Sequence, residues 1–598
     1  MILCLAIAIA AHHKRKQHSY TDSWATLFRM PDGSISAWLV QRRFLALLLL
    51  GLLLYVPFLG MRDMWYPDEP DIGEVCKAMY DSGDWIAPRR MGEIWVDYPP
   101  MIYWTGTATS HLLGGFSPFA LRLPNALAAI ALALIVAWAA SRWWGAATGF
   151  WAGLVLLTFQ QYAYEAVNYR PDVLFALFIG AGMLVYAKGV GERPSWLLRV
   201  AGFALLGLAM LSKGPLGLLL PGLVLTLWHG SRREWRRILE LVPLSLVALA
   251  VYLPWFIACA HAMGADSILQ ELYAQSLERF SGATFRGHGQ PAYYYFTQIW
   301  VDLLWWGPLL PFAVWWGVRS GRWRDRNYQL ALWWFGTFLV FLSTAVTKRQ
   351  VYMLPAHPAA ALLLAPWIAR LTQPKTAAGP KPSAKSVRAY GFFLTGLFVV
   401  LAGVMVAIAL AADQIVRIGE LTGTKAAVVY AERVPAAVMA VVLLAAAWWI
   451  GQAVRKGSAR DILIRLAVSS IPFFMVVFGV IMPALNPHKT YVPQGEWIRS
   501  HIGTEESFGL AYPPRGHHKM GGFKLHTDAH VELLNSREEL ERYLSEHPAS
   551  IVLLHDKHIE DYYPAGDDSW QSRVIHELTI GRDRYLVLQV PAGVSSNT

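Results

Sequence analysis

The chain has 598 residues, of which 55% are apolar and only 16% are charged, and its mean hydropathy is +0.35. Soluble domains are about 45–50% apolar and about 25% charged, so the composition excludes an ordinary soluble enzyme. The net charge of +11 does not indicate nucleic-acid binding, because the basic residues lie in short loops between apolar blocks. The composition predicts an all-α polytopic membrane protein.

The first residues, MILCLAIAIAAHHKRK, resemble a signal peptide only superficially, because the cations follow the apolar run instead of preceding it. The run is also too short to cross a bilayer. We therefore expect this run to be either a start-site extension or a cytoplasmic tail, with residues 1–43 forming a cytoplasmic segment ahead of the membrane domain.

Thirteen apolar blocks follow in chain order, with lengths suited to crossing a hydrocarbon core of ~30 Å. Every second connecting loop is rich in Lys or Arg, which places those loops and the N-terminus in the cytoplasm. An odd number of spans puts the C-terminus on the other side. The expected spans are 44–60, 120–140, 146–160, 173–188, 200–212, 215–229, 240–260, 294–317, 328–346, 351–369, 390–412, 434–451 and 462–484.

The last part of the chain, 485–598, is charged and has no long apolar run. SFGLAY, VELL, SIVLL and RYLVLQV are typical of short strands, and SREELERYLSEH (536–547) opens with a Ser-x-x-Glu capping box that predicts a helix. We expect a small periplasmic α/β domain here, with a packing or acceptor-docking role. The membrane domain then spans 44–484, and its long outer loops are 61–119 and 261–293.

The loops expected outside the cytoplasm carry unusual polar residues at the ends of spans. Ionised groups at membrane depth cost ~2.5–3.5 kcal/mol each on insertion scales, so they usually line a cavity or form pairs. Five connections contribute to one face of the predicted bundle. Their residues are Asp68 and Glu69, Asp172, Lys213, Arg279 with His288 and Tyr294, and Lys348, Arg349 and Tyr352.

Each of these residues also has a purely structural interpretation. Asp68 and Glu69 are placed where acids favour a first helical turn, and Asp172 follows Pro171 and suits a helix start. Lys213 and Lys348 could extend to lipid headgroups, and His288 could be an ordinary loop side chain. The co-location of acids and cations is what favours a site.

This combination suits transfer of a sugar from a lipid-linked phosphate. Cations at the bilayer surface stabilise the phosphate charge as it leaves. A carboxylate accepts the proton of the acceptor or stabilises the oxocarbenium-like sugar centre.

At these residues the chain resembles the bacterial lipid A aminoarabinose transferases, within the protein O-mannosyltransferase-like branch of membrane glycosyltransferases with the class C fold. The motifs are Pro-Asp-Glu at 67–69, AMYDSGDWIAP, DYPPMIYW, Asp172, SKGPLGLLLP, HGQPAYYY and TKRQVYMLP. They span about 60–370, and they are more specific for the class than for the substrate.

The resemblance implies transfer of 4-amino-4-deoxy-L-arabinose from undecaprenyl phosphate to lipid A phosphates at the periplasmic face of the inner membrane, which makes lipid A cationic and confers polymyxin resistance. It implies that Asp68, with Glu69 beside it, and Asp172 are the catalytic acids. Lys213, Arg279 and Lys348 fall where cations hold the carrier phosphate, with Arg349, Tyr352 and Tyr294 nearby. Relatives can have Lys at the position of Tyr98, so one phosphate contact is replaced or absent.

The resemblance requires no cofactor for catalysis but leaves room for bound zinc or another divalent metal, with His288 and either Glu93 or Asp97 as candidate ligands. It implies a monomer that binds donor, acceptor and membrane lipids. The hypothesis for the chemistry is an inverting direct displacement without a covalent enzyme intermediate.

Three other functions stay open from the residues alone. An enzyme of the same fold could glycosylate protein or another lipid. A transporter or flippase would use the buried charges as a relay, but it predicts internal repeats and broken helices near the midplane, and the spans show no repeat. A scaffold for envelope assembly predicts that Asp68 is dispensable.

Overall fold

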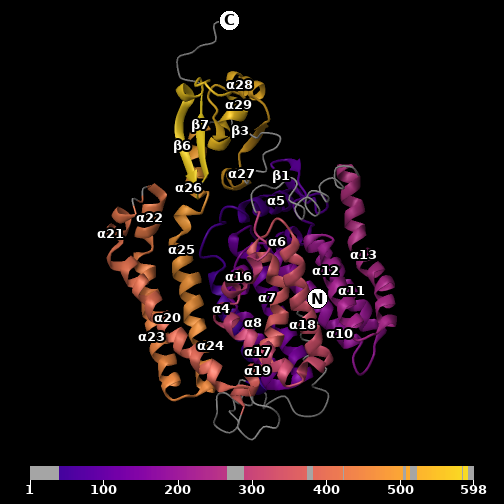
Figure 1. Ribbon diagram of the computed structural model, residues 1–598. Coiled ribbons are helices and arrows are strands. Elements are labelled where there is room, and N and C mark those ends of the chain that lie inside the picture. Colours follow the sequence, from indigo (N-terminus) through magenta and orange to yellow (C-terminus); the bar gives the residue numbers. More distant parts are fainter. Residues whose placement is uncertain are drawn as a thin grey trace, which may run out of the picture.

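The computed structural model describes residues 40–264, 289–373, 382–419, 421, 423–502, 507–511, 521–581 and 583–589. These residues form a long helical bundle with a small α/β domain at its upper end (Figure 1). The predicted segment 1–43 lies almost wholly outside the described residues, as do Arg279 and His288.

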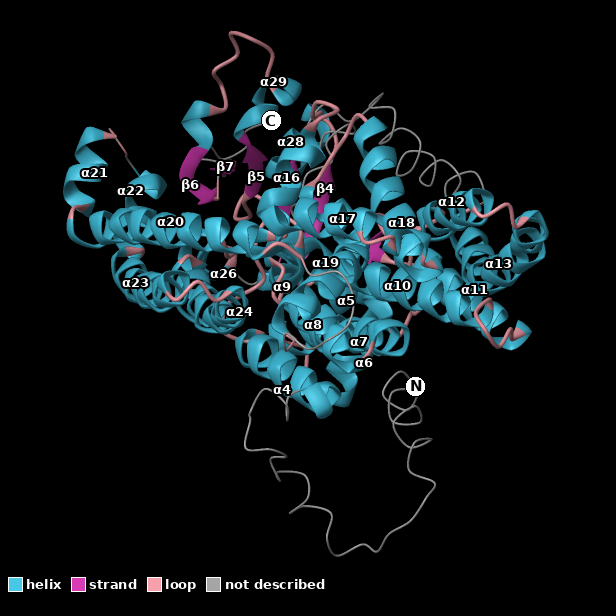
Figure 2. Ribbon diagram, turned by 60° about the horizontal axis from the view of Figure 1, so that its bottom comes forward, coloured by secondary structure: helices cyan, strands magenta, loops and turns pink. Residues whose placement is uncertain are grey.

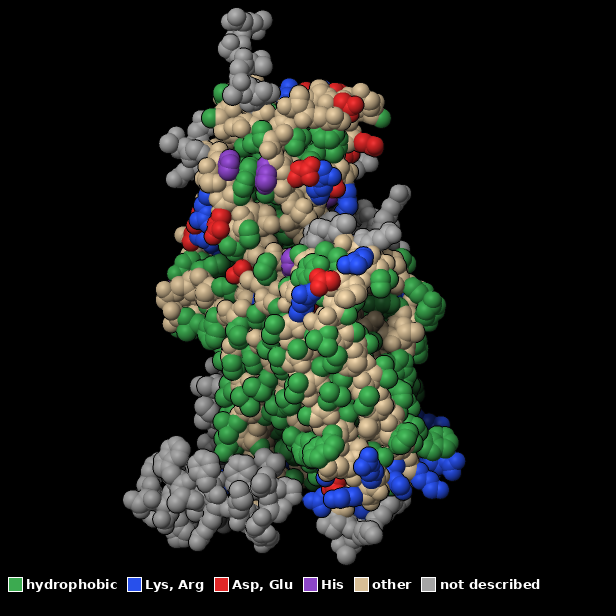
Figure 3. All heavy atoms as spheres, turned by 90° about the vertical axis from the view of Figure 1, so that its left-hand side faces the viewer, with side chains coloured by type: hydrophobic (Ala, Val, Ile, Leu, Met, Phe, Trp, Pro, Cys, Tyr) green, Lys and Arg blue, Asp and Glu red, His purple; other side chains and the backbone are tan. Residues whose placement is uncertain are grey.

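The bundle contains a helix, or a short series of helices, in each of the thirteen predicted intervals. Within the described ranges, eight helical segments are long and apolar enough to cross a membrane, and three shorter apolar helices accompany them. The chain is therefore a multi-pass membrane protein, as Figure 3 illustrates with its band of apolar side chains between two charged ends. The helices are α4 (Arg43–Tyr55), α7 (Pro118–Trp144), α8 (Ala146–Leu157), α10 (Asp172–Gly189), α11 (Trp196–Lys213), α12 (Leu216–Ser231), α13 (Trp235–Met263), α16 (Tyr294–Asp302), α17 (Leu310–Arg319), α18 (Arg326–Thr344), α19 (His357–Thr372), α20 (Ala384–Leu410), α23 (Arg433–Arg455), α24 (Ala459–Val476) and α25 (Met482–Ala484).

Several of the expected spans are not continuous α-helices, and prolines lie at two of the breaks. The interval 294–317 is divided between α16 and α17 by the 3₁₀ turn η4 (Leu304–Leu309), which contains Pro308. Proline has no N–H to donate and its ring clashes with the preceding turn. Likewise, η6 (Gln350–Ala356), a 3₁₀ segment containing Pro355, precedes α19. The hydropathy pattern gives the place of these spans but not their local breaks.

Short helices connect the spans at the upper end of the bundle. The first loop forms α5 (Glu69–Ser82), a two-stranded hairpin of β1 (Arg89–Arg90) and β2 (Glu93–Ile94), and α6 (Met101–Leu112). Helix α9 (Gln160–Ala166) lies between α8 and α10. Figure 2 shows α10 and α19 among the central helices, whereas α20, α21 (Ala412–Ile418), α22 (Gly423–Ala431) and α23 lie at one side.

The C-terminal domain is built on a five-stranded sheet in the order β4-β3-β5-β7-β6. β3 is parallel to β4 and β5, whereas β7 is antiparallel to β5 and β6. Buried side chains alternate between the two faces, as strand geometry requires: Phe508 and Leu510 belong to one apolar cluster and Ala511 to the other. The elements are α26 (Val492–His501), β3 (Ser507–Ala511), α27 (Gly521–Thr527), β4 (His530–Leu534), α28 (Arg537–Glu546), β5 (Val552–His555), α29 (Ile559–Tyr562), β6 (Val574–Ile580) and β7 (Asp583–Leu588).

The four expected strands and the expected helix of this domain are present. The Oγ of Ser536 accepts a hydrogen bond from the Glu539 amide, as the capping box predicts. The return bond differs: the Glu539 carboxylate accepts from the amide of Asn535, one residue before the cap. Strand β6 was not expected, because its exposed positions give VIHELTI a mixed polarity.

A buried charge network fixes the first loop to the bundle. Glu69 receives hydrogen bonds from both nitrogens of the Arg122 fork at 2.9 Å and from Arg62 at 2.5 Å. The amides of Trp65 and Tyr169 also donate to it, at 2.9 and 2.8 Å. Burial alone would raise the pKa of Glu69, but Arg122 and Arg62 hold that pKa well below its usual range.

The C-terminal domain rests on α5. The Oδ1 atom of Asp71 accepts a 2.7 Å hydrogen bond from the amide of Gly521, the first residue of α27. Glu74, one helical turn further along α5, accepts from the amide of Met91 at 3.0 Å. Its other oxygen, Oε2, is buried and has no hydrogen-bond partner among the described residues. The junction between bundle and domain therefore contains buried carboxylates.

We expect Glu69→Gln to lower the free energy of unfolding by about 3–5 kcal/mol, because it leaves two buried guanidinium groups without a counter-charge. Thermal unfolding in nanodiscs would measure the loss. Asp81→Asn is the matched control on the same helix: it breaks only the exposed pair with Lys77, which is worth about 0.3–0.5 kcal/mol. Equal melting temperatures for Glu69→Gln and the parent protein would contradict this account.

The junction also predicts a pH dependence. Burial raises the pKa of Glu74 to about 7, against the opposing effects of the Met91 amide and Arg90. Because the folded pKa lies above the unfolded one, the folded state binds more protons between the two values, and stability falls as pH rises through 7. Glu74→Gln removes this contribution. The melting temperature of Glu74→Gln minus that of the parent should therefore be larger at pH 8.5 than at pH 5. The same difference at both pH values would exclude a titrating Glu74.

Candidate active site

Asp68 lies at the N-terminal cap of α5, but its side chain does not cap the helix. Its Oδ2 atom instead accepts hydrogen bonds from the guanidinium groups of Arg170 and Arg349, the second at 2.6 Å. Arg170 precedes α10, and Arg349 lies between α18 and η6. The structure thus brings three connections that are far apart in sequence to one carboxylate, which is 4% exposed.

Asp172 and Lys213 form a second ion pair beside the first. Asp172 is the first residue of α10, where an acid is favoured by the helix dipole, and Lys213 is the last residue of α11, where a cation is favoured. The Lys213 ammonium donates to Asp172 Oδ1 and lies 4.5 Å from the centre of the Tyr352 ring. Gly214, with a φ of +75°, ends α11 directly after the lysine.

Glu165 connects the Asp68 ion pairs with the Asp172–Lys213 pair in one cluster. It was not predicted from the sequence. Its Oε1 atom accepts from Gln161 at 2.9 Å and from Arg170 at 3.4 Å. Burial raises the pKa of Glu165 to about 7; Arg170, Arg349 and Lys213 oppose this rise and Asp172 adds to it. Arg170 was missed as well. A signal was present in the sequence, because YEAVNYRPD (164–172) places two further charges between two apolar spans.

We define the site cluster as six side chains: three carboxylates and three cations that lie within electrostatic reach of one another. When all three carboxylates are ionised, their charges balance those of the three cations. A phosphate that entered it would compete with carboxylates for Arg349 and Lys213. The site cluster consists of Asp68, Glu165, Asp172, Arg170, Lys213 and Arg349.

Glu69 does not share the surroundings of Asp68, although the two are neighbours in sequence. All its hydrogen bonds run to Arg62, Arg122 and two backbone amides of the bundle. The structure therefore gives Glu69 an anchoring environment instead of one at the site cluster.

Lys348 also lies apart from the ion pairs. Its ammonium donates to the carbonyl oxygens of Gln290, at 2.8 Å, and Ala345. These bonds, together with the isolated bridge between Gly289 and Thr347, connect the end of the loop before α16 to the end of α18. Lys348 is 4% exposed.

Tyrosines border the site cluster. Tyr98 is half-buried and acts electrostatically on Arg170. Tyr294, the first residue of α16, packs its ring 5.1 Å from that of Tyr295, whose hydroxyl donates to the Arg349 carbonyl at 3.0 Å. These contacts place the predicted tyrosines at the edge of the cluster.

Two of the residues proposed for a metal cannot be compared with the structure. His288 and the side chain of Glu93 lie outside the described residues, and so does Arg279. Among the side chains that are described, no group of three or more His, Cys, Asp or Glu lies close enough together to hold a metal ion.

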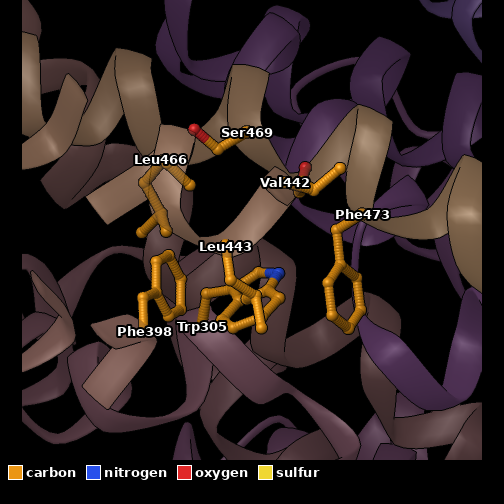
Figure 4. A pocket seen from close by; sticks show the side chains of 9 residues that line it. Trp305, Phe398, Val442, Leu443, Leu466, Ser469 and Phe473 are labelled. Atoms are coloured by element: carbon orange, nitrogen blue, oxygen red, sulfur yellow. The ribbon is translucent and has the colours of Figure 1, made fainter. Parts of the chain in front are cut away.

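A separate apolar pocket lies between α20, α23, α24 and η4 (Figure 4). Trp305 and Phe398 line it, with Ser469 as a polar group at its wall. No charged residue lines this pocket, so it is distinct from the site cluster.

Comparison with known proteins agrees with this geometry. A family model described as dolichyl-phosphate-mannose-protein mannosyltransferase matches residues 97–257. The undecaprenyl phosphate-alpha-4-amino-4-deoxy-L-arabinose arabinosyl transferase of Edwardsiella ictaluri is 31% identical over 334 residues, covering 54% of this chain and 59% of that protein. The protein of the same name from Aeromonas salmonicida is 32% identical over 333 residues, with the same coverage. The chain thus aligns with less than two-thirds of the length of these curated relatives.

The fold match extends further than the sequence match. The crystal structure of ArnT from Cupriavidus metallidurans bound to undecaprenyl phosphate superposes with a TM-score of 0.69 at 21% identity, covering 94% of this chain and all of that one. The apo structure of the same protein gives a TM-score of 0.64. The resemblance to aminoarabinose transferases is confirmed, and the chain has the ArnT fold.

Proposed function

We propose that this protein transfers 4-amino-4-deoxy-L-arabinose from undecaprenyl phosphate to a phosphate group of lipid A. The observation that carries the proposal is the site cluster: a buried aspartate held by two arginines, beside a lysine–aspartate pair, at one end of a membrane bundle. Its support also comes from relatives that are named for this reaction and from a fold neighbour that was solved with the lipid carrier.

The proposal includes the topology. Residues 44–484 cross the inner membrane thirteen times, residues 1–43 are cytoplasmic, and residues 485–598 form a periplasmic domain. The alternation of basic loops supports this orientation. The C-terminal domain lies next to α5, at whose first turn Asp68 is placed, which is consistent with it (Figure 1). The protein acts as a monomer on two lipid substrates.

In the proposed reaction an oxygen of the lipid A phosphate attacks the anomeric carbon as the bond to the carrier phosphate breaks. The electron pair of that bond leaves with undecaprenyl phosphate. Lys213 and Arg349, with Lys348 and Arg279 as further predicted contacts, stabilise the leaving charge. The acceptor oxygen is already anionic near neutral pH, so no general base is required. Asp68 and Asp172 then orient the sugar and stabilise its positive charge.

An enzyme of the same fold that glycosylates protein is the second candidate, because the matching family model is described by that activity. A hydroxyl acceptor must lose a proton, so Asp68 would then act as the base. Assays with purified lipid A and with a Ser/Thr peptide as acceptors distinguish the two.

Asp68→Asn should reduce transfer by about 10²-fold or more, because it removes the charge that holds Arg170 and Arg349 and stabilises the sugar. Mass spectrometry of lipid A from cells expressing each variant would show loss of the pentosamine increment. Asp81→Asn, at the exposed end of the same helix, should retain it. A glycosyl ester trapped on Asp68 or Asp172 would contradict the direct displacement.

Lys213→Met should weaken binding of undecaprenyl phosphate by about 10–150-fold, which corresponds to the 1.5–3 kcal/mol of a hydrogen bond to a charged group. Titration of the purified protein with the carrier measures this directly. Lys188→Met is the control. Lys188 lies near the C-terminal end of α10, at the end of the helix away from Asp172, and its ammonium packs over the Trp138 ring. An unchanged affinity for Lys213→Met would exclude Lys213 from the carrier site.

A further inference from the structure

The segment that carries Asp68 is held from two sides. From the bundle, Arg62 and Arg122 bind Glu69. From the opposite side the contacts come from the last quarter of the chain. We call residues 63–71 the Asp68 segment.

Five of these contacts involve the backbone or an amide side chain of the last quarter, and in one of them the Asn486 amide donates to Oδ2 of Asp63 at 2.9 Å. Asn486 accepts from the Asp63 amide at 3.0 Å and from the Trp65 indole at 2.8 Å. The Tyr66 amide donates to the Lys489 carbonyl at 2.9 Å, and Gly521 donates to Asp71 at 2.7 Å.

The Tyr66 side chain makes the longest-range contact of the segment. Its hydroxyl donates to Oδ2 of Asp583, at the start of β7. The ring approaches the turn between β6 and β7 so closely that a Cβ on Gly581 would lie 3.2 Å from it. Gly581 has a φ of +61°, a conformation that favours glycine, and a Cβ there would press on the tyrosine ring. The turn therefore fits the tyrosine ring.

Asp583 is suited to remain an anionic acceptor. His555, Tyr66 and Lys557 hold its pKa well below the usual range despite partial burial. Lys557 binds the other oxygen, Oδ1, at 2.9 Å and is itself exposed. Hydrogen bonds to a charged partner are stronger than neutral ones, so this contact can restrain the segment.

Asp68 lies two residues after Tyr66, and its side chain makes no hydrogen bond that caps α5. We propose that Tyr66 is a positioning residue for the transfer site: its bond to Asp583 uses the C-terminal domain to hold Asp68 against Arg170 and Arg349. The expected effect on kcat rests on the proposed function, whereas the expected effect on the mobility of the Asp68 segment rests on the contacts alone.

The test uses the full-length protein in nanodiscs with Tyr66→Phe, Asp583→Asn and the double variant. Tyr66→Phe keeps the ring and removes only the hydroxyl. Tyr563→Phe is the matched control, because it also removes a tyrosine bond to a carboxylate, that to Glu541 at 3.1 Å, within the same domain. Lys557→Met removes one further partner of Asp583, besides His555, without touching the Asp68 segment.

Two readouts are measured: kcat and donor KM for transfer to lipid A, and hydrogen–deuterium exchange of the amides at 69–74. We expect Tyr66→Phe to lower kcat about 10-fold with donor KM within about twofold, since small misplacements of a catalytic group can cost up to ~10²-fold. Exchange at 69–74 should quicken. The double variant should resemble the more severe single variant, and Tyr563→Phe should resemble the parent in both readouts.

Parent-like kcat in Tyr66→Phe, or a reduced kcat with unchanged exchange at 69–74, would overturn the inference. So would an equal effect of Tyr563→Phe. If the parent protein transfers no sugar, the proposed function fails, and exchange alone then decides the positioning claim: faster exchange in Tyr66→Phe but not in Tyr563→Phe supports it, and unchanged exchange in both refutes it.

Discussion

The buried carboxylate of Glu69 is the constraint on which the upper end of the bundle depends. Burying an unpaired carboxylate or an unpaired guanidinium group costs several kcal/mol of folding free energy. Arg62, Arg122 and Glu69 can therefore be buried only in contact with one another. Arg122 belongs to α7, and the Tyr169 amide that completes the set belongs to the connection before α10. Satisfying one acid therefore brings the first loop, α7 and the start of α10 to one place.

The position of Asp68 follows from this anchor. Successive residues at a helix start point in different directions, so an inward-pointing Glu69 leaves its neighbour facing Arg170 and Arg349. The two adjacent acids thus have different partners. Glu69 is bound by two arginines and two backbone amides, four donor groups in all. Asp68 is bound by two arginines from two other connections. Each cation of the site cluster contacts a carboxylate, which opposes the repulsion between the cations and lets them stay close together.

Much of this arrangement could be predicted from sequence. Apolar block length and the alternation of basic loops give the helices, and charges at the ends of spans place Asp68, Asp172, Lys213 and Arg349 at one end. What could not be predicted is pairing. Nothing local distinguishes Glu69 from Asp68, because the difference is made by Arg122, 53 residues away. Lys348 was expected at the phosphate, yet it bonds to two carbonyl oxygens that only the folded loop brings near it. Glu165 was overlooked because a short helix between two spans leaves no period to read.

The C-terminal domain shows the same limit at longer range. Its strands are readable from alternating apolar residues, whereas its contact with Tyr66 joins residues 517 positions apart. Asp583 and Gly581 lie at the end of the sheet where β6 is connected to β7. Tyr66 is held on the side of the bundle by the hydrogen bonds of Glu69, three residues further along the chain. Neither part alone fixes the segment between them, since Tyr66 and Glu69 lie on either side of Asp68 in structure and in sequence. Because the membrane bundle supplies one restraint and β7 supplies the other, the proposed positioning of Asp68 depends on the folding of both the bundle and the C-terminal domain.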